Sequence, residues 1–322
     1  MISRNDFEAR QLAFAFPCRG DTIHFRNDNI VIKDKDGCIK YQTTCYLLHI
    51  LFIIGNTSIS TTVLEKSSKF CFSLVFMSEN FRPYIALYHK AEGNILLRKR
   101  QYSIDSNDIG ANIIANKIVN QRKVLSRIRN KDLELKKAIE KLEELATIVV
   151  TPGLTCQEIM GFEGAASKVY FHEMFKNHGW TMRCPRAKHD EINCLLDIGY
   201  TMLFNIVNSL LEMYGFDTYV GVLHRPFFHR KSLTCDIVEP FRPIIDRAIR
   251  KMANLGMIKE KDFYYNQNQY TLFGKPAVPY LRYMTEAILE CKNDIYLYIQ
   301  RYYRAFIQGK EISEYPEFSL EV

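Results

Sequence analysis

The stretch from Asn112 to Ile148 reads NIIANKIVNQRKVLSRIRNKDLELKKAIEKLEELATI, and it indicates the fold of the larger part of the chain. Its apolar residues recur at spacings of three and four, with Lys, Arg and Glu between them, as in one or two amphipathic helices. No proline lies between Pro83 and Pro152, so a long helical region is unobstructed. The helical pattern continues beyond it, with breaks near three glycines, Gly179, Gly215 and Gly256.

The first ninety residues have a different pattern. Short runs rich in β-branched and aromatic residues alternate with Asn, Asp and Gly turn signals, which predicts strands over residues 21–25, 29–32, 38–41, 72–76 and 84–88. Asp36-Gly37 is a typical hairpin turn, and residues 61–70 are expected to form a helix. The predicted fold class is α+β, with a small β-rich domain at residues 1–90 and a larger all-α catalytic domain at residues 91–322.

Composition limits the class of protein. The 322 residues are 47% hydrophobic and 25% charged, which is typical of a soluble globular protein. The longest apolar run, residues 47–55, is too short to cross a bilayer, and the N-terminus lacks the pattern of a secretory signal. We therefore expect a cytoplasmic protein that does not contact a membrane. Its formal net charge of +7 suits a polyanionic partner.

The nine cysteines are scattered, and none forms a C-x-x-C pair. This distribution favours reduced thiols over a disulfide framework or a zinc knuckle. One group of histidines and cysteines is close enough in sequence to suggest zinc, but its spacings match no closed zinc pattern, so we favour ordinary helix-surface residues. The group consists of His172, His178, Cys184, His189 and Cys194.

Four side chains are candidates for chemistry. Glu163 lies among small and apolar neighbours, where a charge needs a partner. His224 ends an apolar run. Asp236 and Glu239 are three residues apart, so on a helix they would share a face, and the prolines that follow should kink that helix.

Two carboxylates and one imidazole favour Mg²⁺ or Mn²⁺ over structural zinc. Such an ion can polarise a phosphodiester and offset the charge that develops in the transition state. Each residue also has an ordinary interpretation: Glu163 as an exposed helix residue, His224 as a structural histidine, and Asp236 as a helix N-terminal residue. Spacing alone leaves both interpretations open, because ligands distant in sequence cannot be placed without a fold.

Basic residues gather around the same segments. A solvated charged face would explain any one group, whereas phosphate anchors that position a duplex would explain all of them together. The candidates for DNA contact are Arg183, Arg186, Lys188, Arg225, Arg230, Lys231 and Arg242.

Residues 161–171, 190–201, 215–224 and 232–243 together carry a more specific signal. They resemble the glutamate motif, the D-x-x-N-x-L-L-x-x-G-Y helix, the histidine motif and the final acidic motif of the CRISPR-associated integrase family, the first-numbered Cas protein. The resemblance covers the C-terminal two-thirds of the chain, whereas the N-terminal region is similar only in its β-rich sequence pattern. Residues 239–243 look most like members from class 2 systems of type V.

The resemblance implies that Glu163, His224 and Glu239 hold Mg²⁺ or Mn²⁺, with Asp236 as an alternative ligand to Glu239. It implies that the 3′-hydroxyl of a double-stranded spacer precursor attacks a phosphodiester at the edge of a CRISPR repeat, without a covalent enzyme intermediate. It also implies a homodimer formed through the β-rich domain. Two such dimers would be bridged by a small ferredoxin-like partner protein in a prokaryotic cytoplasm.

Two other functions stay open at this point. A general metal-dependent nuclease for branched DNA would use the same chemistry on other substrates. A non-catalytic basic DNA-binding scaffold would need no catalytic residues, and the presence of Glu163, His224 and Glu239 together counts against it.

Overall fold

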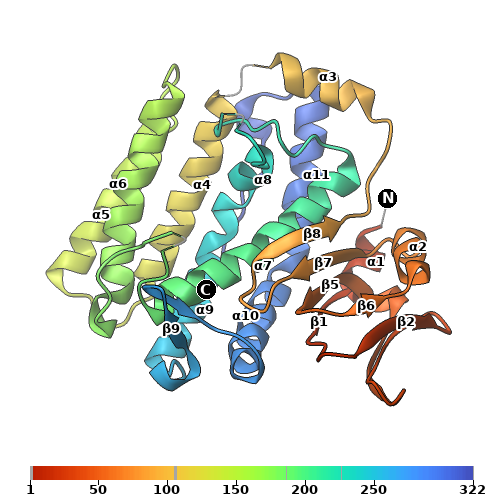
Figure 1. The fold of residues 1–322 in the computed structure, drawn as a ribbon. Helices are drawn as coiled ribbons and strands as arrows, with labels where there is room; N and C mark the ends of the chain where they lie inside the picture. Colours follow the sequence, from red (N-terminus) through yellow and green to blue (C-terminus); the bar gives the residue numbers. More distant parts are fainter. Residues whose placement is uncertain (1–2, 105–106, 186, 226, 322) are drawn as a thin grey trace.

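Two four-stranded sheets form the N-terminal part of the protein (Figure 1). The computed structural model describes residues 3–104, 107–185, 187–225 and 227–321. The first sheet has parallel β1, β5 and β7 with β8 antiparallel at its edge, in the order β1 (Gln11–Ala15), β5 (Leu48–Ile54), β7 (Ser73–Met77), β8 (Pro83–Leu87). The second has the order β4 (Ile39–Thr44), β3 (Asn29–Lys33), β2 (Thr22–Arg26), β6 (Ser58–Ile59).

The predicted hairpin and the predicted helix in this region are confirmed. β3 and β4 pair antiparallel, and the turn between them closes with a hydrogen bond from the Gly37 amide to the Asp34 carbonyl. Gly37 has a φ of 84°, a conformation that glycine adopts without a steric penalty. Helix α2 (Thr61–Lys69) lies where residues 61–70 were expected to be helical. The pairing of β5 with β1 and β7 is parallel, which local sequence patterns do not specify.

Strand β5 is buried along its whole length, so both of its faces pack against other parts of the protein. Successive side chains of a strand point to opposite faces. Leu51 and Ile53 belong to an apolar cluster with the second sheet and α2, whereas Ile50, Phe52 and Ile54 belong to the large core that the helices form. The first sheet is therefore a layer between the second sheet and the helical part.

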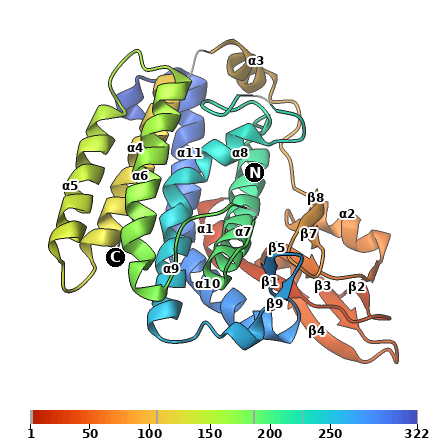
Figure 2. The ribbon, with the colours of Figure 1, turned by 60° about the vertical axis from the view of Figure 1, so that its left-hand side comes forward.

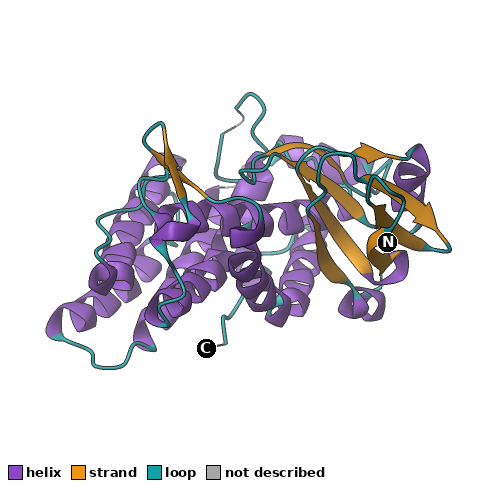
Figure 3. Ribbon diagram, turned by 60° about the horizontal axis from the view of Figure 1, so that its bottom comes forward, coloured by secondary structure: helices purple, strands orange, loops and turns teal. Residues whose placement is uncertain are grey.

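In the described residues the helical part contains nine α-helices, and the strands of the two N-terminal sheets lie together at one side of it (Figures 2 and 3). They are α3 (Ile95–Ser103), α4 (Asn107–Ser126), α5 (Leu133–Ile148), α6 (Cys156–Phe175), α7 (Glu191–Tyr214), α8 (Ser232–Ile237), α9 (Arg242–Asn254), α10 (Val278–Glu290) and α11 (Lys292–Gln308), and α1 (Arg4–Ala9) packs against the last of them. The stretch 112–148 thus forms parts of two helices, α4 and α5, which pack against each other and against α6.

Helix α7 is long and apolar enough to cross a membrane, but 83% of its most apolar window is buried inside the protein. It contacts α8, α9, α10 and α11, as expected for the central helix of a core. Gly199 allows its closest approach to α9, because a Cβ at this position would lie 2.5 Å from Ile245 Cγ2.

The predicted α+β class is confirmed, with one correction. The C-terminal part is not all-α, since it contains the hairpin β9 (Tyr264–Asn266) and β10 (Gln269–Thr271). The two residues between these strands, Gln267 and Asn268, have φ values of 47° and 58°, as a tight two-residue hairpin turn requires. The division into domains at residues 90 and 91 stays a prediction, although the last strand of the first sheet ends at Leu87 and α3 begins at Ile95.

Candidate active site

Glu163 and Glu239 share one cation, the ammonium group of Lys117. Lys117 Nζ forms an ion pair with Glu163 Oε1 and lies 2.7 Å from Glu239 Oε2. Ser167 donates a hydrogen bond of 2.9 Å to Glu163 Oε1, and Arg242 Nη2 lies 3.0 Å from Glu239 Oε1. Helices α4, α6 and α9 and the 3₁₀ turn Glu239–Phe241 thus bring two acidic and two basic side chains together.

Burial and charge act against each other in this cluster. Burial lowers the pKa of Lys117, but the negative charges of Glu239 and Glu163 outweigh it and raise that pKa above its usual value. Burial would raise the pKa of Glu163, but the charge and hydrogen bond of Lys117, the Ser167 hydroxyl and Arg242 lower it. The pKa of Arg242 is also raised, because Glu239 outweighs its burial. These shifts keep Lys117 and Arg242 positively charged and Glu163 ionised at neutral pH.

Glu239 lies in a 3₁₀ turn between two helices and not within one continuous helix. Helix α8 ends at Ile237, and Pro240 lies in the 3₁₀ turn that leads into α9. The predicted break at the prolines is confirmed. The expectation that Asp236 and Glu239 share a helix face is wrong, since the two residues lie in different elements.

Asp236 instead holds the loop that carries His224. Asp236 Oδ2 accepts hydrogen bonds from the backbone amides of Val222 and Leu223, at 2.7 and 3.1 Å. Its Oδ1 accepts from the His224 amide at 3.1 Å and lies 2.6 Å from His224 Nδ1. A Cβ at Gly221 would lie 2.5 Å from Asp236 Oδ2, so glycine is needed for this close approach. With Nδ1 engaged, Nε2 is the nitrogen of His224 that can bind a ligand.

The residues fit a divalent ion in their chemistry. Two carboxylates converge on one cation position, and the buried Glu239 Oε2 lies 2.7 Å from the ammonium that occupies it. Carboxylate oxygens and one imidazole nitrogen are ligands for Mg²⁺ or Mn²⁺. In the described part of the chain, however, no three His, Cys, Asp or Glu side chains are close enough to hold a metal as they stand. Lys117 takes the place between the carboxylates, so an ion would have to displace its ammonium group.

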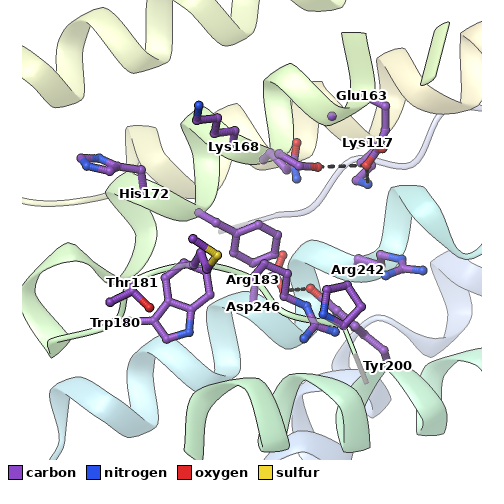
Figure 4. Close-up of a pocket in the computed structure, with 16 residues that line it drawn as sticks. Lys117, Glu163, Lys168, His172, Trp180, Thr181, Arg183, Tyr200, Arg242 and Asp246 are labelled. Atoms are coloured by element: carbon purple, nitrogen blue, oxygen red, sulfur yellow. Dashed lines mark hydrogen bonds and ion pairs between the residues drawn. The ribbon is translucent and has the colours of Figure 1, made fainter. Parts of the chain in front are cut away.

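A pocket of about 540 Å³ opens beside this cluster (Figure 4). Glu163 and Lys117 lie near each other in Figure 4, and Trp180 lies farther along the pocket. Arg183 and Arg242 also line it, and both lie over the ring of Tyr200, at 5.5 and 4.7 Å from its centroid. The pocket therefore combines aromatic surface with positive charge next to the two carboxylates.

A buried carboxyl group lies beneath this pocket. Asp246 accepts hydrogen bonds from the hydroxyls of Tyr200 and Tyr170, the latter at 3.1 Å. Burial raises the pKa of Asp246 to about 6, although both tyrosines and the charges of Arg242 and Lys117 act in the opposite direction. Asp246 thus fixes the hydroxyl of the tyrosine on which the two arginines stack.

The candidates for DNA contact have different surroundings. Arg183 pairs with Asp197 at 2.5 Å, and Lys231 lies 3.2 Å from Glu212, so each is already partly neutralised. Arg225 is exposed, and Arg230 and Arg242 are half-buried. Lys188 is only 6% exposed, and its carbonyl accepts a hydrogen bond from the Tyr270 amide of the β9–β10 hairpin, so burial disfavours it as a phosphate contact. Arg186 lies outside the described residues.

Sequence reasoning missed Lys117, Tyr200 and Asp246. A usable signal was present for two of them, because Lys117 and Asp246 are charged residues within otherwise apolar helix faces, as Glu163 is. Tyr200 gave no such signal, since an aromatic residue on a buried helix is usually part of the core.

Solved structures with similar folds include a Cas1 protein and a casposase. A Cas1 protein from Thermotoga maritima superimposes with a TM-score of 0.79 at 20% identity, over 97% of this chain and 100% of that one. A casposase bound to its integration product also gives 0.79 at 20% identity, over 97% of this chain and 95% of that one. At these identities the likeness concerns the fold.

Sequence relatives establish the family. The chain is 32% identical over 275 residues to a CRISPR-associated endonuclease Cas1 from Thermodesulfovibrio yellowstonii. The aligned region covers 81% of each protein. It is 31% identical over 255 residues to a CRISPR-associated endonuclease Cas1 from Chlorobaculum tepidum. That aligned region covers 72% of this chain and 73% of the relative. The family model for CRISPR associated protein Cas1 matches residues 18–278. The chain therefore belongs to the Cas1 family of CRISPR-associated proteins.

Proposed function

We propose that this protein is a metal-dependent DNA integrase that inserts short foreign DNA fragments into a CRISPR array. The observation that carries the proposal is the convergence of Glu163 and Glu239 on one cation position. These are the two carboxylates on which the resemblance to the integrase family depends. A scaffold that only bound DNA would gain nothing from two glutamates placed together in a basic environment, since they repel phosphate.

Glu163, Glu239 and His224 would hold Mg²⁺ or Mn²⁺. The bound ion would supply Lewis acidity at the scissile phosphate and offset charge in the transition state. Asp236 orients the imidazole of His224 through Nδ1 and is a positioning residue, because all four donors around its carboxylate come from the loop 222–224. This arrangement favours Glu239 over Asp236 as the direct ligand.

Arg242 is the basic residue best placed to contact the reacting phosphate. It pairs with Glu239 and lines the pocket beside Glu163. The reaction is a one-step exchange of phosphodiester bonds. The 3′-hydroxyl of the donor strand bonds to a repeat phosphorus and gives its proton to solvent. The bond from that phosphorus to the repeat's own 3′-oxygen breaks, and the released oxygen takes up a proton from solvent.

We further propose that the protein works on double-stranded DNA as a homodimer, with two dimers joined by a small ferredoxin-like partner in a prokaryotic cytoplasm. The support is the family membership and the fold shared with a chain from a Cas6-RT-Cas1–Cas2 complex, to which this chain corresponds over 36% of that chain's length.

The test is a joining assay with short 3′-hydroxyl duplexes and a repeat-bearing plasmid in Mn²⁺, with and without the presumed partner. We expect joined products with the wild type and with the control E140Q, which changes an exposed glutamate of α5. E163A and E239A, or EDTA, should abolish them.

Other outcomes would identify other functions. Equal joining by E163A would show that the assignment of this site is wrong. Metal-dependent cleavage of branched DNA without joining would identify a general nuclease. Duplex binding by every variant without any reaction would identify a scaffold.

A further inference from the structure

The loop that carries His224 is held between three helices. On one side is α8, whose Asp236 accepts hydrogen bonds from three consecutive backbone amides of the loop. On another side is α4, where a Cβ at Gly110 would lie only 3.0 Å from the Cβ of Leu223. Glycine therefore permits the close approach of the loop to α4. The third helix is α6, which reaches the loop through its first residue, Cys156.

The contact with α6 is a hydrogen bond from a thiol. Cys156 is half-buried, and its Sγ donates to the carbonyl oxygen of Leu223 across 3.0 Å. A thiol is a weak donor, but this one engages a carbonyl 67 residues farther along the chain instead of a group in its own helix. Leu223 directly precedes His224, so the hydrogen bond joins the start of α6 to the peptide unit that leads into the histidine.

Both polar groups of that peptide unit are engaged. Its carbonyl accepts from Cys156 of α6, and its amide, which belongs to His224, donates to Asp236 Oδ1 of α8 at 3.1 Å. The two groups of a planar trans peptide point in opposite directions. A contact at each end therefore fixes the plane of the unit and the direction in which the chain enters His224. With Asp236 alone, the carbonyl end of the plane would be free to move.

Cys156 is itself held by the well-ordered start of α6. Thr155 and Glu158 form a capping box there, in which the Thr155 amide donates to the Glu158 carboxylate at 2.8 Å. Such a cap stabilises the first turn of a helix. Glu163 follows Cys156 by seven residues, which is about two turns, so both residues lie on the same face of α6. The thiol thus meets the loop of His224 on the helix face that carries the glutamate.

We propose that Cys156 is a positioning residue that fixes His224 relative to the helix that carries Glu163. Metal–ligand distances tolerate deviations of only about 0.2 Å, so a loop that shifts against α6 could not keep the imidazole and the carboxylate on one ion. Cys156 acts through Leu223 and is not itself a ligand. The inference deepens the proposed function and rests on it, since it connects the thiol to the metal site of Glu163, Glu239 and His224.

Two substitutions separate hydrogen bonding from packing at this position. C156S keeps a donor on a slightly shorter side chain, whereas C156V fills the space without any donor. If the sulfur only packed, valine would replace it better than serine. If its hydrogen bond positions the loop, serine is the better replacement. The control is T285A, which removes a half-buried hydrogen bond from a hydroxyl to a carbonyl within α10.

The first measurement is hydrogen–deuterium exchange over residues 221–225 of the metal-free protein. The amides of residues 222–224 are bonded to Asp236, so their exchange reports opening of the loop. We expect C156V to raise their exchange rate roughly tenfold, as the loss of one hydrogen bond would, and C156S and T285A to stay near the wild type. Wild-type exchange in C156V would overturn the proposal, and so would an equal rise in C156V and C156S.

The second measurement is Mn²⁺ binding, followed by the electron paramagnetic resonance signal of the free ion. We expect C156V to raise the dissociation constant roughly tenfold, C156S to keep nearly the wild-type value, and E163A to lose the site. C156A also lacks a donor and should behave like C156V in both measurements, which covers the case that valine does not fit. Equal Mn²⁺ affinity in the wild type, C156V and C156A would overturn the proposal.

The exchange measurement needs neither metal nor DNA, so the two proposals can fail separately. A wild type that binds no Mn²⁺ and joins no DNA would defeat the proposed function. Loop exchange in C156V and C156S would still decide whether the thiol holds His224 in place.

Discussion

Asp236 Oδ1 lies 2.6 Å from His224 Nδ1, and the same oxygen also accepts the His224 backbone amide. One carboxylate thus fixes both the main chain and the ring of the histidine. Such a contact sets which ring nitrogen faces outward, and it makes the imidazole a better ligand.

We predict that D236N slows DNA joining by roughly 10- to 100-fold, because the amide cannot accept from all four donors and the ring loses its orientation. Affinity for duplex DNA, measured by fluorescence anisotropy, should change little. D132N is the matched control, since Asp132 also accepts a backbone hydrogen bond, at the start of α5. Undiminished joining by a folded D236N would remove Asp236 from the site.

Lys117 should be a stabilising cation that a metal can replace. We predict that K117M lowers the free energy of unfolding in EDTA by about 3–5 kcal/mol, because it leaves two partly buried carboxylates without their shared partner. Mn²⁺ should restore more of the melting temperature in K117M than it adds to the wild type. Differential scanning fluorimetry measures both effects, with K136M on the exposed face of α5 as the control. Identical responses to Mn²⁺ in both proteins would argue against a metal site at Glu163 and Glu239.

Asp246 should make stability depend on pH. Its folded pKa of about 6 lies above the ordinary aspartate pKa of 3.8, so the native state binds the proton more tightly than the unfolded state does. The stability it contributes is fully present below pH 4 and is lost as pH rises through about 6, by about 3 kcal/mol.

The variant D246N does not titrate there. The unfolding free energy of D246N minus that of the wild type should therefore rise between pH 4 and pH 6.5 in urea titrations. The same difference for D262N, another tyrosine-bound aspartate, serves as the control. A difference for D246N that stays constant over this range would contradict the raised pKa.

The C-terminal segment should support the active site through α4. Buried Asn120 donates to the carbonyls of Phe318 and Pro240 and accepts the Leu320 amide at 2.8 Å, so it ties this segment to the residue after Glu239. We predict that N120A lowers the free energy of unfolding by about 1–3 kcal/mol, because it leaves buried backbone groups unpaired. Joining should fall as well, which the assay described above measures.

The control for Asn120 is S319A, which removes only an exposed hydrogen bond to Lys123. If N120A were destabilised but joined DNA at the wild-type rate under conditions where it is folded, the segment would have only a structural role.

Periodicity predicted the elements well where each segment's own pattern is sufficient. The 3.6-residue pattern of 112–148 corresponds to α4 and α5, and Asp36-Gly37 gave the β3–β4 hairpin. Such features depend on neighbouring residues, so they are encoded locally. The parallel pairing of β5 with β1 and β7 joins segments far apart in the chain, and no local pattern specified it.

The sequence by itself determined the α+β class, the family motifs and the candidates Glu163, His224 and Glu239. Only the tertiary structure decided that Glu163 and Glu239 meet at Lys117, that Asp236 turns away to hold His224, and that Lys188 is buried. The physical reason is that residue type and spacing fix which groups a segment carries and which face they occupy. The partner of each charge depends on which helices pack together, and that packing is a property of the whole core.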